Sequence, residues 1–214
     1  MPLFDELLAV HHPTAPSNIF GVVIGLVTNN KDPEKMGRVK LKFPWLSDTD
    51  ESDWARMAVP MGGNDRGFFF LPEVDDEVLV AFEQGNSRFP YVLGVLWNGK
   101  DKPPLKNEDG KNNLRVIKSR SGHMIRLNDE DGKETIEIID KSGKNQIVID
   151  TAKNAITLTS DKDITLSASK GTITLDAQKL VFKSSADTQV EAGSGLELKA
   201  SAQMKLKGST IDLN

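Results

Sequence analysis

The chain has 214 residues, no cysteine and a formal net charge of −4 at pH 7, and 27% of its residues are charged. This length allows one large domain or two small ones. The mild acidity argues against a dedicated nucleic-acid or membrane-surface binder, because both need an excess of Lys and Arg. The absence of cysteine excludes disulfides, thiolate chemistry and cysteine-ligated zinc.

The N-terminal segment carries two acidic and no basic residues in its first ten positions. It begins MPLFDELLAV, with neither a basic leader nor a long apolar core, so we expect no signal peptide and synthesis in the cytoplasm. No stretch reaches the roughly 18–20 apolar residues of a membrane span. Residues 1–17 form a separate segment in this interpretation. Leu3 to Val10 within it is either a short docking helix for a partner or a frayed terminus.

The two halves of the chain differ in composition. All ten prolines lie at or before Pro104, and all tryptophans and the single tyrosine lie between Trp45 and Trp97. The second half is rich in Ser, Thr, Lys and β-branched residues. Glycine, proline and charged residues from 100 to 113 predict a linker between the halves.

Residues 18–99 are predicted to form an oligosaccharide/oligonucleotide-binding (OB) type β-barrel. The strongest strand patterns are Glu77–Glu83 and Pro90–Trp97. Weaker strands are expected at 19–27, 38–43, 54–60 and 68–71, with turn residues between them. Five to six short strands in about 80 residues, with aromatic side chains to fill the interior, are typical of this barrel.

Residues 114–153 are predicted to form a neck of hairpin-like strands, because apolar doublets recur there at a spacing of 11. The doublets are Leu114/Val116, Ile125/Leu127, Ile136/Ile138 and Ile147/Ile149. Glycine-containing turns at 121–123, 131–133 and 142–144 separate them.

Residues 154–214 are predicted to form a β-helix, because the period shortens to 8. Such a period fits one short strand plus a tight turn. Side chains two apart share a face of a strand, so each repeat turns two apolar residues inward. One rung slips near Gly171, and the last pair slips one residue early. The inward residues are Ile156, Leu158, Ile164, Leu166, Ile173, Leu175, Leu180, Phe182, Val190, Leu196, Leu198, Met204, Leu206, Ile211 and Leu213.

Such a shaft is not expected to be stable as a single chain. Two apolar residues per repeat offset too little of the roughly 1–2 kcal/mol per residue that ordering the backbone costs. Identical chains that wrap together would pair one another's strand edges and bury the apolar columns on a common axis. The absence of proline from this region agrees with continuous strand pairing. We therefore expect an intertwined homotrimer.

The sequence resembles the VgrG and phage baseplate-protein-V spikes of contractile injection machines. The similar barrel segments are 37–45, 53–56, 71–82 and 90–94, and Ser121-Gly122-His123 and the octads resemble the neck and shaft. The resemblance implies an all-β fold, with an OB barrel followed by a triangular, triple-stranded β-helix. It also implies a homotrimer that pierces the target envelope, assembled into a baseplate with a hub protein on its N-terminal side.

Two departures from the family pattern limit what carries over. Some relatives insert a lysozyme domain between barrel and helix, where this chain has only the linker. Others end in a histidine pair that holds iron, whereas this chain ends TIDLN. The resemblance therefore implies a separate tip protein of the PAAR-repeat type at the C-terminal end.

No residue pattern predicts a catalytic, cofactor or metal site. His11, His12 and His123 are too few for a metal site, and His123 is interpreted as a turn or packing residue of the neck. Residues 128–132 faintly resemble a calcium loop, but Leu127 and Ile138 would occupy ligand positions, so a hairpin turn is predicted.

Two alternative functions remain open from the sequence. Acidic pairs such as Asp75/Asp76 and Asp129/Asp131 would suit a polysaccharide-degrading or -binding tailspike. A basic cluster near Trp45 would suit a barrel that binds single-stranded nucleic acid. That cluster consists of Lys31, Lys35, Arg38, Lys40 and Lys42. We expect a non-enzymatic spike that binds no nucleic acid.

Overall fold

The computed structural model describes residues 18–47 and 49–212. The chain divides between Asp161 and Lys162 into two compact units. Strands dominate the first unit, and the one helical element found in the described ranges is a 3₁₀ turn, η1 (Glu83–Gly85). Within those ranges, the search for an apolar helix of membrane-spanning length finds none. The all-β prediction is confirmed.

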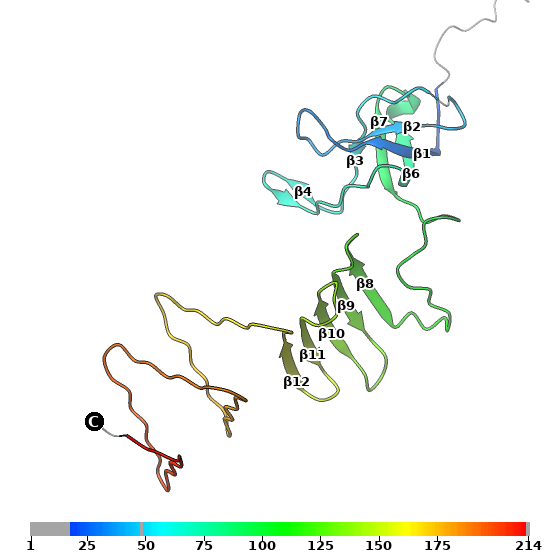
Figure 1. The fold of residues 1–214 in the computed structure, drawn as a ribbon. Coiled ribbons are helices and arrows are strands. Elements are labelled where there is room, and N and C mark those ends of the chain that lie inside the picture. The colour runs from blue at the N-terminus through cyan, green and yellow to red at the C-terminus, as the bar shows by residue number, and fades with distance from the viewer. Residues whose placement is uncertain (1–17, 48, 213–214) are drawn as a thin grey trace, which may run out of the picture. The chain divides into compact units, whose positions relative to one another are not determined.

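A five-stranded sheet forms the barrel, in the order β2-β1-β6-β7-β3 (Figure 1). Its strands are β1 (Val22–Asn29), β2 (Lys40–Lys42), β3 (Arg56–Met57), β6 (Glu77–Phe82) and β7 (Pro90–Val95). Neighbours are antiparallel except β3 and β7. The predicted strands at 77–83 and 90–97 are therefore confirmed, each shorter at its C-terminal end.

The sheet closes on itself around a small apolar core. A bridge between Val39 and Ala55 joins the two edge segments, those of β2 and β3. The alternation in β6 turns Val78, Val80 and Phe82 inward, as a period of two requires. The core consists of Val27, Val39, Leu41, Phe43, Ala55, Val78, Val80, Phe82 and Val92.

The strand predicted at 68–71 is not formed, and a short hairpin lies directly before these residues. It pairs β4 (Gly62–Gly63) with β5 (Arg66–Gly67), and Phe68–Phe70 follow without strand structure. The prediction was wrong because it assumed that the aromatic run faces the barrel interior. Instead Phe69 is 78% exposed, and the core aromatics are Phe43 and Phe82.

A second five-stranded sheet is a simple antiparallel meander in the order β12-β11-β10-β9-β8. Its strands are β8 (Leu114–Lys118), β9 (Met124–Asn128), β10 (Thr135–Ile139), β11 (Gln146–Asp150) and β12 (Ala155–Thr159). The strands lie side by side in chain order (Figure 1). No strand is formed by residues 96–113, which connect β7 to β8.

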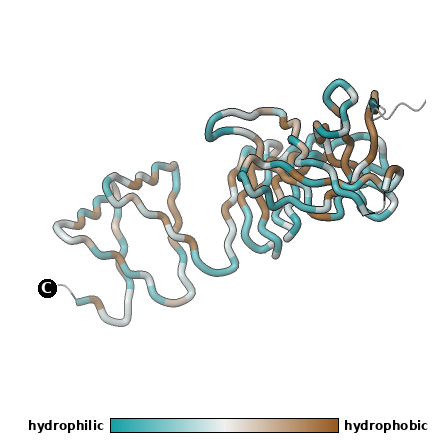
Figure 2. Tube along the Cα trace, turned by 90° about the horizontal axis from the view of Figure 1, so that it is seen from above, coloured by the Kyte–Doolittle hydropathy of each residue, from teal (hydrophilic) through white to brown (hydrophobic). Residues whose placement is uncertain are grey.

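The second unit, described for residues 162–212, contains no strand in that range. All these residues are exposed. Figure 2 shows apolar stretches that return at intervals along this part of the tube.

Candidate functional site

One face of the β8–β12 sheet is almost entirely aliphatic. Cross-strand pairing places Ile125 opposite Ile138, Ile138 opposite Ile147, and Ile147 opposite Leu158. A second row on the same face begins at Arg115, which pairs with Leu127, and continues with aliphatic residues. We call the aliphatic residues of this side the apolar face: Ile117, Ile125, Leu127, Ile136, Ile138, Ile147, Ile149, Ile156 and Leu158.

The opposite face of the same sheet is mostly polar. The Arg126 guanidinium forms an ion pair with Glu137 on the neighbouring strand, and its Nε donates to Oε2 at 2.7 Å. The hydroxyl of Thr135 donates to the other oxygen of Glu137 at 2.8 Å. A sheet with one polar and one apolar face packs its apolar face against another layer.

No layer formed by the described residues covers the apolar face. Its nine side chains are 39–76% exposed, with Ile149 lowest and Ile156 highest. Monomeric soluble proteins rarely expose contiguous apolar patches larger than roughly a few hundred Å², and larger ones mark interaction sites. The apolar face therefore has the properties of an assembly surface.

The register of β8 corrects one of the predicted doublets. Leu114 and Val116 pair with Asn128 and Arg126, so they lie on the polar side of the sheet, and Ile117 takes the place opposite Ile125. The prediction extended the spacing of 11 through a hairpin whose loop sets a different register. The signal was present in the sequence, because pairing outward from the five-residue turn 119–123 brings Ile117 to Ile125.

The octad residues predicted to be inward are exposed in the single chain. Ile156 and Leu158 belong to β12 and extend the apolar face. The others from Ile164 to Ile211 are 49–77% exposed, and Leu213 lies outside the described residues. In a packed shaft these side chains would have to be buried. The backbone N–H and C=O groups beside them would also need hydrogen-bond partners.

The histidine and acidic motifs have structural roles wherever they are described. His123 Nδ1 accepts the backbone N–H of Lys141 at 3.3 Å, which links two turns and confirms its interpretation as a turn residue. Asn128 closes the β9–β10 hairpin by donating to the Lys133 carbonyl at 2.9 Å, as predicted. Within residues 18–47 and 49–212, no cluster of three or more His, Asp or Glu side chains is arranged to hold a metal ion. His11 and His12 lie outside the described residues.

The acidic pairs do not face one another across a cleft. Asp76 accepts the backbone N–H of Glu73 at 2.8 Å in the turn before β6, and Asp75 there adopts a left-handed backbone with φ of 76°. Asp129 forms an ion pair with Arg115 of the neighbouring strand. These carboxylates stabilise turns and strand pairs.

Two of the five residues of the basic cluster, Arg38 and Lys40, form ion pairs within the chain. Arg38 forms an ion pair with Asp32 at 2.8 Å and a longer one with Glu34, and Asp32 also accepts backbone N–H groups of its own loop. The guanidinium holds the pKa of Asp32 well below its usual range. Lys40 pairs with Glu51 at 3.2 Å. Cations held in this way are poorly suited to track a phosphate backbone.

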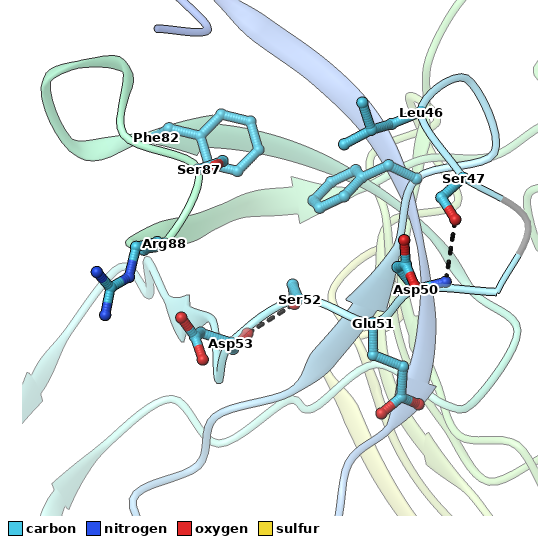
Figure 3. Close-up of a pocket in the computed structure, with 10 residues that line it drawn as sticks. Leu46, Ser47, Asp50, Glu51, Ser52, Asp53, Phe82, Ser87 and Arg88 are labelled. Carbon is cyan, nitrogen blue, oxygen red and sulfur yellow. Dashed lines mark hydrogen bonds between the residues drawn. The ribbon is translucent and has the colours of Figure 1, made fainter. Parts of the chain in front are cut away.

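An open pocket at one end of the barrel offers no catalytic arrangement. Phe82, Leu46 and Arg88 line it together with the loop 50–53 (Figure 3). The Ser47 hydroxyl accepts the N–H of Asp50 at 3.2 Å, and the Ser52 hydroxyl donates to the Asp53 carbonyl at 2.6 Å. Both hydroxyls therefore serve the loop itself, while Arg88 and Glu51 point in different directions (Figure 3).

Comparison with known proteins finds similarity in the barrel and beyond it. Residues 23–97 match the type VI secretion system/phage-baseplate injector OB domain. The type VI secretion system spike protein VgrG1b of Pseudomonas aeruginosa is 27% identical over 153 residues, which are 66% of this chain and 20% of that protein. VgrG2a of the same organism is 31% identical over 111 residues, 50% of this chain and 13% of the relative.

A toxin is also among the relatives. The actin cross-linking toxin VgrG1 of Vibrio cholerae is 25% identical over 146 residues, 66% of this chain and 13% of the toxin. The chain spans about a fifth or less of the length of these three relatives. The match and the barrel that these residues form identify residues 23–97 as a type VI secretion system/phage-baseplate injector OB domain, and the VgrG relatives support a place for the chain among VgrG and phage baseplate-protein-V spikes.

Proposed function

We propose that three copies of this chain form the non-enzymatic central spike of a contractile tail or injection machine. The observation that carries the proposal is the uncovered apolar face of β8–β12. Its last strand, β12, contains Ile156 and Leu158, which are also the first octad residues. Three copies that turn these faces toward one axis would form a closed prism with the Arg126–Glu137 face outward. Nothing in the described carboxylates or basic residues favours the polysaccharide or nucleic-acid alternatives.

The octads would continue the prism as a triangular, triple-stranded β-helix. Each strand edge of one copy would pair with a neighbouring copy, which supplies the ladder hydrogen bonds that residues 162–212 lack within the chain. The axis would be filled by the column that begins at Ile156 and Leu158. Continuous pairing among three chains gives a shaft that resists buckling, as piercing a cell envelope requires.

Partners and location follow from the same proposal and rest on the family resemblance. The barrel side would join a hub protein in the baseplate, and the C-terminal octads would carry a tip protein of the PAAR type. Residues 1–17, which would provide a hub contact, lie outside the described residues.

Light scattering on the purified chain tests the central claim. A homotrimer has three times the 23.5 kDa mass of one chain. A stable trimer at micromolar concentration is the expected result. A monodisperse 23.5 kDa particle with a folded barrel would overturn the proposal.

A further inference from the structure

A series of bends divides the C-terminal part of the chain into short segments. The bends at 161–162, 185–186, 193–194 and 201–202 have two residues each, the turn at 169–171 has three, and those at 178 and 209 have one. The Gly171 N–H closes the long turn by donating to the Ala168 carbonyl at 3.2 Å. Between the bends lie six-residue segments at 163–168, 172–177, 179–184, 187–192, 195–200 and 203–208. Equal positions can therefore be compared from one segment to the next.

The fifth position of these segments carries charges that alternate in sign. From the second segment on it holds Asp176, Lys183, Glu191, Lys199 and finally Lys207. We call these five residues the charge ladder. The second and fourth positions hold the octad residues assigned above to the axis of the proposed shaft. Because neighbouring positions of an extended segment lie on opposite sides, the charge ladder faces outward in that shaft.

The charge ladder has no counter-charges within one chain. All five side chains belong to exposed residues, and none of them forms an ion pair with a residue that the structure describes. Glu191 accepts a hydrogen bond from the side-chain amide of Gln189, which carries no charge. The alternation of sign is therefore not used by the chain on its own.

Three copies wound around one axis would bring the alternating charges together. A chain that turns to the next face at each bend returns to its first face after three segments, and the other two copies fill the levels between. On each face, successive strands then come from different copies and from successive segments, about 4.8 Å apart. Strands that run in the same direction place equal positions side by side, so each ladder residue lies beside the next one along the sequence, in another copy.

We propose that the charge ladder joins the copies by ion pairs between successive segments. Asp176 of one copy pairs with Lys183 of a second, and Lys183 with Glu191 and Glu191 with Lys199 are matched in the same way. Opposite charges on neighbouring strands stabilise a sheet, and like charges opposite one another destabilise it. Lys199 and Lys207 form the one like-charged contact of the series. This inference rests on the proposed triple-stranded shaft.

The same contacts favour one register of the three chains. A copy displaced by one segment would bring Asp176 beside Glu191 and Lys183 beside Lys199. Both contacts are between like charges, so the displaced arrangement is disfavoured. Octads that present similar apolar pairs to the axis are thus distinguished by their outer charges.

Charge reversal tests the ladder through the temperature at which light scattering loses the trimeric mass. Glu191→Lys turns two attractive contacts per copy into repulsive ones and should lower that temperature by about 5 °C or more. The difference from wild type should shrink at about 1 M salt, where the screening length is about 3 Å. Adding Lys199→Glu to Glu191→Lys restores one attractive contact and creates another with Lys207. The double variant should therefore melt within about 2 °C of wild type.

A matched control separates the ladder from net charge. Glu191→Lys with Lys170→Glu has the net charge of wild type, but Lys170 lies in the turn at 169–171, outside the ladder. This variant should melt as low as Glu191→Lys alone. If it recovers as fully as the variant with Lys199→Glu, or if Glu191→Lys leaves the melting of the trimer unchanged, the charge ladder is overturned and the spike proposal stands.

Disulfide formation tests the stacking itself, because the chain has no cysteine of its own. Cysteines that replace Lys183 and Glu191 would lie on neighbouring strands of two copies, with Cα atoms about 4.8 Å apart, within the range that a disulfide spans. Oxidation of the native protein should give covalent trimer on a denaturing gel. Lys183→Cys with Lys199→Cys places the two cysteines about 10 Å apart and should stay monomeric on the gel.

The outcomes distinguish the ladder from the trimer. A native trimer in which the Lys183→Cys, Glu191→Cys protein gives only monomer bands overturns the ladder and leaves the trimer standing. Disulfide dimers from Lys183→Cys alone would mean that equal segments lie side by side, which also overturns it. A wild-type mass of one chain overturns the spike proposal and the ladder with it.

Discussion

The barrel and the β8–β12 sheet are both five-stranded, yet only the barrel has an interior of its own. In the barrel, a bridge between Val39 and Ala55 closes the sheet, and both side chains are fully buried. In the meander, the corresponding alternation leaves Ile138 and Ile147 about half exposed. Closure, and not strand content or hydrophobicity, therefore decides which of the two sheets buries its apolar residues within one chain.

Leu198→Asp is expected to have the largest effect on assembly. In the proposed shaft the substitution brings three carboxylates together on the axis, and uncompensated buried charges of this kind cost more than about 4–5 kcal/mol. We expect loss of the trimeric mass in light scattering. Tryptophan fluorescence should remain native, because all three tryptophans lie between Trp45 and Trp97.

Lys199→Asp is the matched control for that variant. It adds the same carboxylate at the neighbouring position, which faces outward in the proposed shaft, and it should leave the trimer intact. A Leu198→Asp protein that remains a heat-stable trimer would show that the axial assignment is wrong.

Leu41→Ala is expected to affect the barrel and not the assembly. Leu41 is fully buried in the barrel core, and removing its side chain should lower the free energy of unfolding by about 2–5 kcal/mol. Denaturant titration followed by tryptophan fluorescence measures this change, and light scattering should still give a trimer. Leu46→Ala, at a 62% exposed position, should cost less than about 0.5 kcal/mol. Equal costs for the two variants would contradict the assigned core.

Ile147→Thr tests whether the copies associate through the apolar face of the meander. Ile147 lies on the apolar face, so the variant should weaken trimer association by about 1–3 kcal/mol per copy. Val148→Thr is the matched control, because its side chain lies on the opposite face. The concentration dependence of the thermal midpoint measures both effects. Equal effects of the two substitutions would mean that the apolar face is not the association surface.

The same two regions explain where sequence reasoning succeeded. Glu77–Glu83 and Pro90–Trp97 were predicted as strands because their alternation is local and the core that it serves lies in the same chain. His123 and the hairpin turn after Asn128 were likewise local features.

Errors arose where pairing partners decide the outcome. A run of aromatics such as Phe68–Phe70 favours a buried strand, but in this chain these residues are exposed and form no strand. The placement of Leu114 and Val116 failed because loop geometry sets antiparallel register. For Leu198 and the other octad residues the proposed partners are other copies, so the fold of one chain does not test their assignment.

The smallest expected effect concerns the turn between β10 and β11, and it does not depend on assembly. Asp140 accepts hydrogen bonds from the Ser142 hydroxyl at 2.8 Å and from the Asn145 backbone and side chain, and these bonds, led by that of Ser142, lower its pKa to about 2. A carboxylate with a depressed folded-state pKa stabilises fully above its usual value of 3.8, and the contribution is lost as pH falls through about 2. Wild type should therefore melt above Asp140→Asn at neutral pH, and the gap should narrow between about pH 4 and 2. Asp131→Asn, in the preceding turn, removes one charge without these bonds and should show a smaller gap. A wild-type advantage over Asp140→Asn that stays constant down to pH 2 would mean that the Asp140 charge does not stabilise the turn.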